Sequence, residues 1–216
     1  MLSRQRNKIW IFGDSFSHGS GMNDWDEYFQ RYLNPNNITK KEWGVYVAEH
    51  FDMELQNKSF GGLSNNAILR LLVENLCNFN KGDIVLIGTT DQFRFEEIID
   101  GKNQSFLVED VMNNMSKDKK IQSVLEDYVR YIHMDNYQQK NKDIIKQINS
   151  IKDHLNNNDI KTIVWHYLTT NPIGIRINMD NVERITQHTN KDIIDEHPSY
   201  KGHEQVSKEF IKILTN

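Results

Sequence analysis

The stretch Lys8-Ile-Trp-Ile-Phe-Gly-Asp-Ser-Phe-Ser-His-Gly19 opens with an apolar run and breaks at a glycine. A short apolar run of this kind, ended by Gly and Asp, is typical of a buried parallel strand. Gly13 permits a tight turn after the strand, and the backbone N–H of Ser15 can then point at a developing negative charge. The stretch therefore predicts a buried strand and, directly after it, a candidate nucleophile.

Further strands and helices alternate along the rest of the chain. Two more apolar runs cover residues 83–88 and 160–166, and a weaker one covers 53–57. Helical patterns cover residues 40–51, 67–78, 144–155 and 200–214, and we expect Thr39 and Glu42 to cap the first and Asn65 or Asn66 the second. Such alternation predicts an α/β fold with a parallel sheet covered on both faces, whose ligands bind at the carboxyl ends of the strands.

The composition is that of a single globular domain over residues 1–216, with 38% hydrophobic residues. Lys and Arg total 26 against 30 Asp and Glu, and the net charge of −4 argues against nucleic acid as a partner. Cys77 is the only cysteine, which excludes an internal disulfide, and we expect it to be a buried small apolar side chain. The apolar run 9–12 is too short for a signal peptide or a membrane span, so a cytoplasmic location is the default expectation.

A base for the serine is found near the other end of the chain, in Asp195-Glu-His-Pro-Ser-Tyr-Lys-Gly-His203. A serine needs a general base, usually a histidine oriented by a carboxylate, to act as a nucleophile. One residue separates Asp195 from His197, so the carboxylate can accept from one ring nitrogen while the other faces Ser15. His188, Asp195, His197 and His203 could instead bind zinc or iron, but their spacing matches no regular helical metal motif, and we expect no metal.

Four blocks of this sequence, in order, resemble those of the SGNH/GDSL hydrolases. They are Gly13-Asp-Ser-Phe16, Asn57-Lys-Ser-Phe-Gly-Gly-Leu-Ser-Asn-Asn66, Ile87-Gly-Thr-Thr-Asp91, and Asp195-Glu-His-Pro198 followed by Gly202 and His203. The resemblance implies a flavodoxin-like three-layer α/β/α sandwich with a mainly parallel sheet. It also implies a triad of Ser15, Asp195 and His197, an oxyanion hole that includes the backbone N–H groups of Ser15 and Gly62, and no metal or organic cofactor.

The third block departs from the family pattern. It usually reads Gly-x-Asn-Asp, and the Asn side chain donates to the oxyanion, whereas Thr90 stands at that position here. A Thr hydroxyl can also donate, and losing one donor typically costs about 100-fold or more in turnover. Asn65 and Asn66 are side chains that could replace it.

Three side chains near these blocks are possible substrate contacts: Asp14, Asn65 and Arg94. Asp14 also suits a structural role, in which it accepts backbone N–H bonds in the turn. Arg94 either meets an anionic group of a substrate or forms a surface ion pair with Glu96 or Glu97. His203 is expected to pack the first turn of the last helix or to bond a loop carbonyl.

The resemblance implies a serine esterase that acts on a small-molecule or carbohydrate carboxylic ester, with O-acetyl groups on carbohydrates as a candidate target. Two alternatives stay open. One is a non-catalytic binding or structural protein that keeps the fold, which Thr90 favours, and the other is an O-acyltransferase that passes the acyl group to a sugar hydroxyl. Residues 96–134 and 168–191 match no block, so the acyl and alcohol parts of the substrate are not defined.

Overall fold

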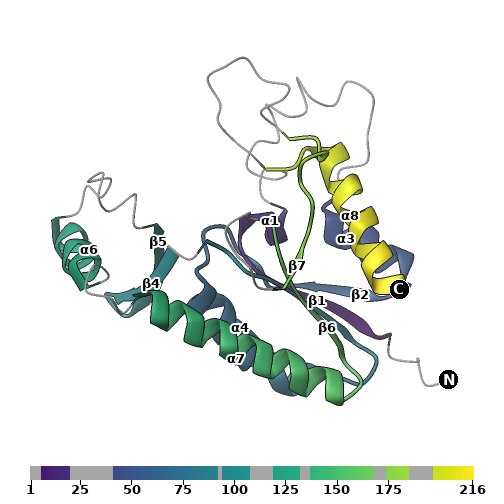
Figure 1. Ribbon diagram of the computed structural model, residues 1–216, viewed down its shortest axis with the longest axis horizontal. Coiled ribbons are helices and arrows are strands. Elements are labelled where there is room, and N and C mark those ends of the chain that lie inside the picture. The colour runs from purple at the N-terminus through teal and green to yellow at the C-terminus, as the bar shows by residue number, and fades with distance from the viewer. Residues whose placement is uncertain are drawn as a thin grey trace.

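A five-stranded parallel sheet forms the centre of the chain (Figure 1). The computed structural model describes residues 6–19, 41–91, 94–107, 119–131, 137–167, 174–184 and 197–216. The strand order is β2-β1-β3-β6-β7, and every neighbouring pair is parallel. The strands are β1 (Lys8–Phe12), β2 (Glu54–Asn57), β3 (Ile84–Gly88), β6 (Lys161–His166) and β7 (Ile175–Arg176). The four strands predicted from the sequence are confirmed, and this order is the flavodoxin-like one, whose direction reverses between β1 and β3.

Helices cover both faces of the sheet, which confirms the predicted three layers. The helices α3 (Trp43–His50) and α8 (Tyr200–Thr215) pack on one face, and α4 (Asn65–Asn75) and α7 (Tyr137–Asn157) pack on the other. Successive side chains of a strand point to opposite faces, so Ile9 and Ile11 enter the core under α3 and α8. Trp10 and Phe12 enter the core under α4 and α7.

Two helices begin at residues other than those predicted. Ser64 caps α4, because its Oγ accepts from the Ala67 N–H at 3.2 Å, so the prediction of Asn65 or Asn66 as the cap was wrong. The helix α3 begins after Glu42, whose carboxylate makes no capping bond and instead accepts from Asn57 Nδ2 at 3.1 Å. Residues 41 and 42 are therefore not helical, and Thr39 lies outside the described residues.

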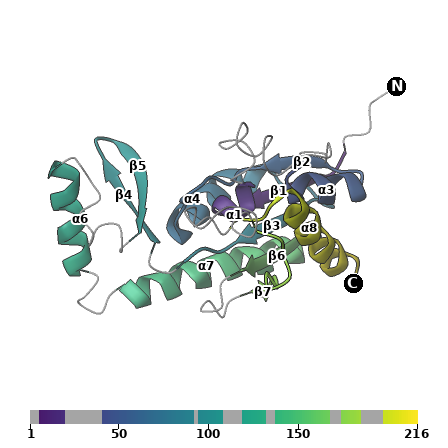
Figure 2. The same ribbon diagram turned by 90° about the horizontal axis from the view of Figure 1, so that it is seen from above.

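An antiparallel hairpin and a helix occupy part of the stretch that the sequence left without a match. Strands β4 (Arg94–Ile99) and β5 (Lys102–Leu107) form a two-stranded sheet of their own, and α6 covers Lys119–Tyr131. These elements stand apart from the central sheet in both Figure 1 and Figure 2. The hairpin turns at Asp100 and Gly101, both of which have positive φ.

Cys77 is exposed, so the prediction that it is buried was wrong. It lies in a short 3₁₀ helix, Leu76–Asn78, beyond the end of α4. The buried positions of α4 end at Leu72, before this short helix begins, and Cys77 therefore falls outside the packed face.

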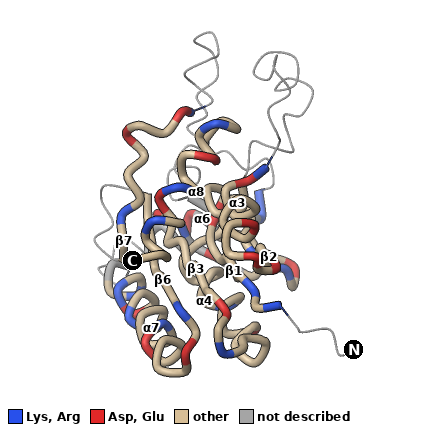
Figure 3. The backbone as a smooth tube through the Cα atoms, turned by 90° about the vertical axis from the view of Figure 1, so that its right-hand side faces the viewer, with Lys and Arg blue, Asp and Glu red and all other residues tan. Residues whose placement is uncertain are grey.

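Acidic and basic residues are mixed along the described backbone, as Figure 3 shows for α7. In the part of the chain that the structure describes, none of the helices combines the length and apolar character needed to cross a bilayer.

Candidate active site

The carboxyl ends of three neighbouring strands meet at one buried carboxylate, that of Asp14. Asp14 follows β1, and its Oδ2 accepts from Thr90 Oγ1, which follows β3, at 2.8 Å. The same oxygen accepts from the hydroxyl of Tyr167, which follows β6, at 2.7 Å. These contacts lie at the switch point between β1 and β3, where ligands bind in open α/β sheets.

Asp14 also fixes the start of α1 (Ser15–His18), because its Oδ1 accepts from the Phe16 N–H at 3.1 Å. Burial raises the pKa of Tyr167 and the Asp14 carboxylate raises it further, so the phenol stays protonated and donates. Asp14 is only 2% exposed, and this burial does not support the substrate contact predicted for it.

The turn that presents Ser15 depends on two glycines. A Cβ placed on Gly13 would lie 2.0 Å from Ser17 Oγ, and one placed on Gly88 would lie 2.4 Å from the same atom. The buried Ser17 therefore fits only because both positions lack a side chain. Ser15 is the first residue of α1 and is half-buried, and an N–H at this position has no acceptor within the helix.

The loop that carries Gly62 is hydrogen-bonded to the serine turn. Lys58 N–H donates to the Ile11 carbonyl at 2.8 Å, and Phe60 N–H donates to the Gly13 carbonyl at 3.2 Å. Asn57 Nδ2, at the end of β2, donates to the Ser17 carbonyl at 3.3 Å. Gly62 has a φ of +82°, which favours glycine there.

His197 contacts the serine turn by stacking on the ring of Phe16, the residue after Ser15. The His197 and Phe16 rings stack with centroids 4.6 Å apart, and the Phe16 and Tyr167 rings stack at 3.8 Å. The His197 Nε2 atom is buried. The loop after His197 is fixed where Ser199 N–H donates to the Glu183 carbonyl at 2.9 Å, and the Ser199 side chain caps α8.

Two members of the proposed site set, Asp195 and the alternative metal ligand His188, lie outside the described residues.

The side chains of Thr90 and Asn65 both form hydrogen bonds within the protein. The single hydroxyl hydrogen of Thr90 goes to Asp14, as described above. Asn65 Oδ1 accepts from the Thr90 N–H at 2.9 Å, and its Nδ2 donates to the Thr90 carbonyl and to Asn141 Oδ1. Both residues are buried, so in this arrangement neither directs a hydrogen at a substrate.

His203 is a buried structural residue of α8. Its Nδ1 accepts from the Trp43 N–H at 3.4 Å, so it bonds a backbone donor and not a loop carbonyl. Burial, and to a smaller extent the nearby His197, together lower the pKa of His203 to about 3, which keeps the ring neutral.

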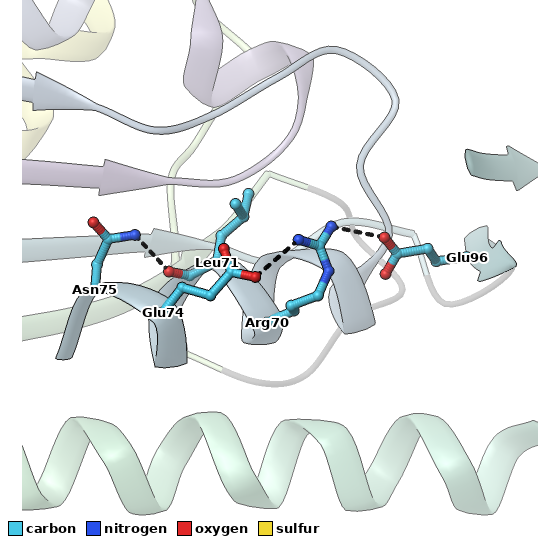
Figure 4. A network of polar contacts seen from close by, with 5 residues as sticks. All are labelled: Arg70, Leu71, Glu74, Asn75 and Glu96. Carbon is cyan, nitrogen blue, oxygen red and sulfur yellow. Dashed lines mark hydrogen bonds and ion pairs between the residues drawn. The ribbon is translucent and has the colours of Figure 1, made fainter. Parts of the chain in front are cut away.

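Arg94 is the first residue of β4, and its side chain faces the Gly62 turn. Its Nη1 lies 3.3 Å from the position that a Cβ on Gly62 would have. Glu96, one of the carboxylates considered for it, pairs instead with Arg70 Nη2 at 2.8 Å (Figure 4). Nothing is described of the Glu97 side chain.

Two residues of this site were not singled out by sequence reasoning, Tyr167 and Asn57. Each stands at the carboxyl end of a strand, Tyr167 directly after β6 and Asn57 as the last residue of β2. That position was the available signal, because polar groups at this edge of a parallel sheet converge.

Comparison with known proteins gives structural similarity only. No family model matches the chain, and no curated protein matches it. Among solved structures, it is similar to the psychrotrophic esterase EstA from Pseudoalteromonas sp., with 16% identity over 97% of this chain and 100% of that one and a TM-score of 0.47. It is also similar to a carbohydrate esterase family 2 enzyme from Corynascus thermopiles, with 14% identity over 100% and 67% of the chains and a TM-score of 0.47.

A third solved structure is a member of the lipolytic protein G-D-S-L family from Veillonella parvula. The identity is 11% over 97% of this chain and 98% of that one, with a TM-score of 0.39. G-D-S-L is the family name that the four sequence blocks suggested. At these identities and scores the similarity carries no argument about activity, and the fold rests on the strand order and the two core layers described above.

Proposed function

We propose that this protein is a serine esterase that hydrolyses carboxylic esters through an acyl-enzyme. The observation that carries the proposal is the stacking of His197 on Phe16, at 4.6 Å between ring centroids. This contact brings His197, the proposed base, next to the residue that follows Ser15, at the switch point of the sheet. A histidine beside a serine on a sharp strand-to-helix turn is the arrangement that serine nucleophiles need.

In the proposed reaction, Ser15 Oγ attacks the ester carbonyl carbon while a ring nitrogen of His197 takes the hydroxyl proton. The carbonyl electrons move to the oxygen, which the backbone N–H groups of Ser15 and Gly62 stabilise. Collapse of this intermediate expels the alcohol, which receives the proton from His197. Water, activated by His197, then releases the acid, and Asp195 is proposed to orient the imidazole throughout. O-acetyl esters of carbohydrates are the substrate class to screen.

The hydrogen bond from Thr90 to Asp14 favours a second candidate, a non-catalytic binding protein. This bond leaves the third block without the side-chain donor that the family pattern supplies. Measurement of turnover separates the two functions.

The first experiment is hydrolysis of p-nitrophenyl acetate by the purified protein and by Ser15→Ala, at neutral and mildly alkaline pH. We expect turnover in the wild-type protein that is lost in the variant, because the acyl-enzyme cannot form without Oγ. Ser17→Ala is not a suitable control, since Ser17 packs between two glycines, but the exposed Ser123→Ala is. Equal turnover in wild type and Ser15→Ala, or none in either, would favour the binding protein.

A further inference from the structure

Arg94 is held at the edge of the site by its own backbone. Its N–H donates to the Asp91 carbonyl at 3.2 Å, so the residue stays next to the carboxyl end of β3. From there the guanidinium reaches the Gly62 turn, with Nη1 3.3 Å from the Cβ position of that glycine. Its charge also reaches the Tyr167 hydroxyl, where it lowers the pKa of Tyr167 against the larger effect of burial. The cation thus lies near both Gly62 and the Asp14–Tyr167 pair.

In the described part of the chain, no carboxylate pairs with this guanidinium. Its Nε atom is buried and has no hydrogen-bond partner there. Arg70, on the neighbouring helix α4, provides the contrast, because it pairs with Glu74 at 3.2 Å and with Glu96 at 2.8 Å (Figure 4). A partly buried charge is costly unless it is paired, so an arginine in this state is suited to an anion that the described part of the chain does not supply.

The proposed oxyanion hole receives no side-chain donor from Thr90 or Asn65. Thr90, at the position of the third block, donates its only hydroxyl hydrogen to Asp14. The two amide hydrogens of Asn65 go to the Thr90 carbonyl and to Asn141. Thr90 and Asn65 therefore have no side-chain hydrogen left to donate, whereas the Arg94 guanidinium carries five N–H donors and stands beside Gly62, a proposed backbone donor. Asn66, the other side chain considered for this role, is exposed at the surface.

We propose that Arg94 is the third donor of the oxyanion hole, in the position that a neutral amide usually fills. The inference rests on the proposed esterase function. As the bond between Ser15 Oγ and the carbonyl carbon forms, the carbonyl electron pair moves to the oxygen, and an N–H of Arg94 donates to that oxygen. When the intermediate collapses, the electron pair returns to form the carbonyl and the alcohol leaves. Arg94 keeps its proton throughout and acts by charge and hydrogen bonding.

The test compares Arg94→Met and Arg94→Lys with Arg70→Met, using the neutral ester p-nitrophenyl acetate. We expect Arg94→Met to lower kcat by about 100-fold with little change in KM, because the interaction forms only in the transition state. Arg94→Lys should recover part of the loss, since it restores the charge. Arg70→Met should keep the wild-type kcat, because it breaks only the ion pairs with Glu74 and Glu96. Circular dichroism and thermal unfolding establish that each variant is folded.

A second readout follows the oxyanion directly. A trifluoromethyl ketone forms an adduct with the serine that carries the negative oxygen, so its affinity should fall in Arg94→Met by the same factor as kcat. Unchanged kcat on the neutral ester, with a loss confined to an ester that bears a carboxylate, would overturn the proposal and make Arg94 a contact for substrate anions. Loss of kcat with unchanged affinity for the ketone would overturn it as well.

Labelling of Ser15 separates failure of this proposal from failure of the esterase function. Diethyl p-nitrophenyl phosphate transfers its phosphoryl group to an activated serine, and intact mass with peptide mapping locates it. A wild-type protein that is labelled at Ser15 and is active, beside an equally active Arg94→Met, overturns only the role of Arg94. A wild-type protein that is neither labelled nor active overturns both proposals.

Discussion

Asp14 organises the carboxyl edge of the sheet at the scale of single residues. Its carboxylate accepts from one backbone N–H and two hydroxyls, and the hydroxyls belong to residues that follow β3 and β6. All three bonds go to the same buried carboxylate, and hydrogen bonds to a carboxylate contribute more than average. One aspartate therefore sets the relative position of three strand ends, including the turn of the proposed nucleophile.

Thr90→Val tests which role the Thr90 hydroxyl has. The change is close to isosteric and removes one of the bonds to Asp14, so we expect the free energy of unfolding to fall by about 1–2 kcal/mol in a urea titration. We expect kcat for p-nitrophenyl acetate to fall by less than about tenfold, because the hydroxyl is directed at Asp14 and not at the oxyanion. Thr90→Ser, which keeps the hydroxyl, is the matched control. A loss of 100-fold or so in kcat without a loss of stability would show that Thr90 donates to the oxyanion after all.

The residues of the serine turn were predictable, and their partners were not. Ser15 and Gly13 follow an apolar run, which is a local pattern that one sequence shows. The contact between Asp14 and Tyr167 joins residues 153 positions apart and depends on how the strand ends line up. The use of the Thr90 hydroxyl is likewise decided by that neighbour and not by the residue type.

At the scale of elements, a second buried carboxylate, that of Asp83, joins the amino ends of the strands β1 and β3. Its oxygens accept from Lys8 N–H at 2.8 Å, Trp10 Nε1 at 3.0 Å and Asn80 N–H at 3.1 Å. Lys8 and Trp10 belong to β1, and Asp83 directly precedes β3. The side chain therefore stabilises the central strand pair at the end opposite Ser15.

Asp83→Ala should destabilise the protein without lowering its kcat. The change leaves buried donors without an acceptor, and we expect the free energy of unfolding to fall by about 2–4 kcal/mol. Asp159→Asn removes the charge of an exposed carboxylate paired with Lys81 at 2.7 Å, keeps a residue type that tolerates the positive φ at this position, and should have no measurable effect on unfolding. Urea titrations of both variants check this, with kcat measured on the folded protein. Equal stability of the two variants would contradict the role given to Asp83.

The strands and helices of the central sheet, apart from β7, were predictable because each has a clear pattern of apolar residues in the sequence. Three strands are buried runs, and Ile145, Ile148 and Leu155 repeat at helical spacing on α7. The hairpin β4–β5 had a readable signal in Asp100-Gly101, the dipeptide favoured in two-residue hairpin turns, but its strands lack the long apolar run that marks β1, β3 and β6 in the sequence. Strand β7 has two residues, both exposed, and so carries no pattern at all.

At the scale of the whole molecule, acid stability depends on two groups with opposite effects. Burial keeps the pKa of His203 at about 3 in the folded protein, below its ordinary value of about 6.5. Between these two pH values the unfolded chain binds more protons, so stability falls as the pH falls. Burial raises the pKa of Glu42 from its ordinary value of 4.5 to about 6, so between these two pH values stability falls as the pH rises.

We expect the effect of His203 to exceed that of Glu42, since its pKa departs further from the ordinary value. In His203→Gln, the loss of stability between about pH 7 and pH 5 should be smaller than in the wild type by about 2 kcal/mol. Thermal unfolding at both pH values gives the slope, which is independent of any fixed cost of the substitution. His50→Gln, at an exposed position of α3, should keep the wild-type slope. If the slope in His203→Gln equals that of the wild type, the lowered pKa assigned to His203 is contradicted.

The two core layers also differ in their light-absorbing residues. Trp10 lies in the layer under α4 and α7, with its ring 5.2 Å from that of Phe79. Trp43 and Trp165 lie 5.8 Å apart in the layer under α3 and α8. Each side of the sheet thus carries its own natural fluorophore among the described residues. In a Trp25→Phe background, Trp10→Phe leaves the two tryptophans under α3 and α8, whereas the double change Trp43→Phe and Trp165→Phe leaves Trp10. Emission spectra of these two proteins would report separately on the loosening of each layer, without an attached dye.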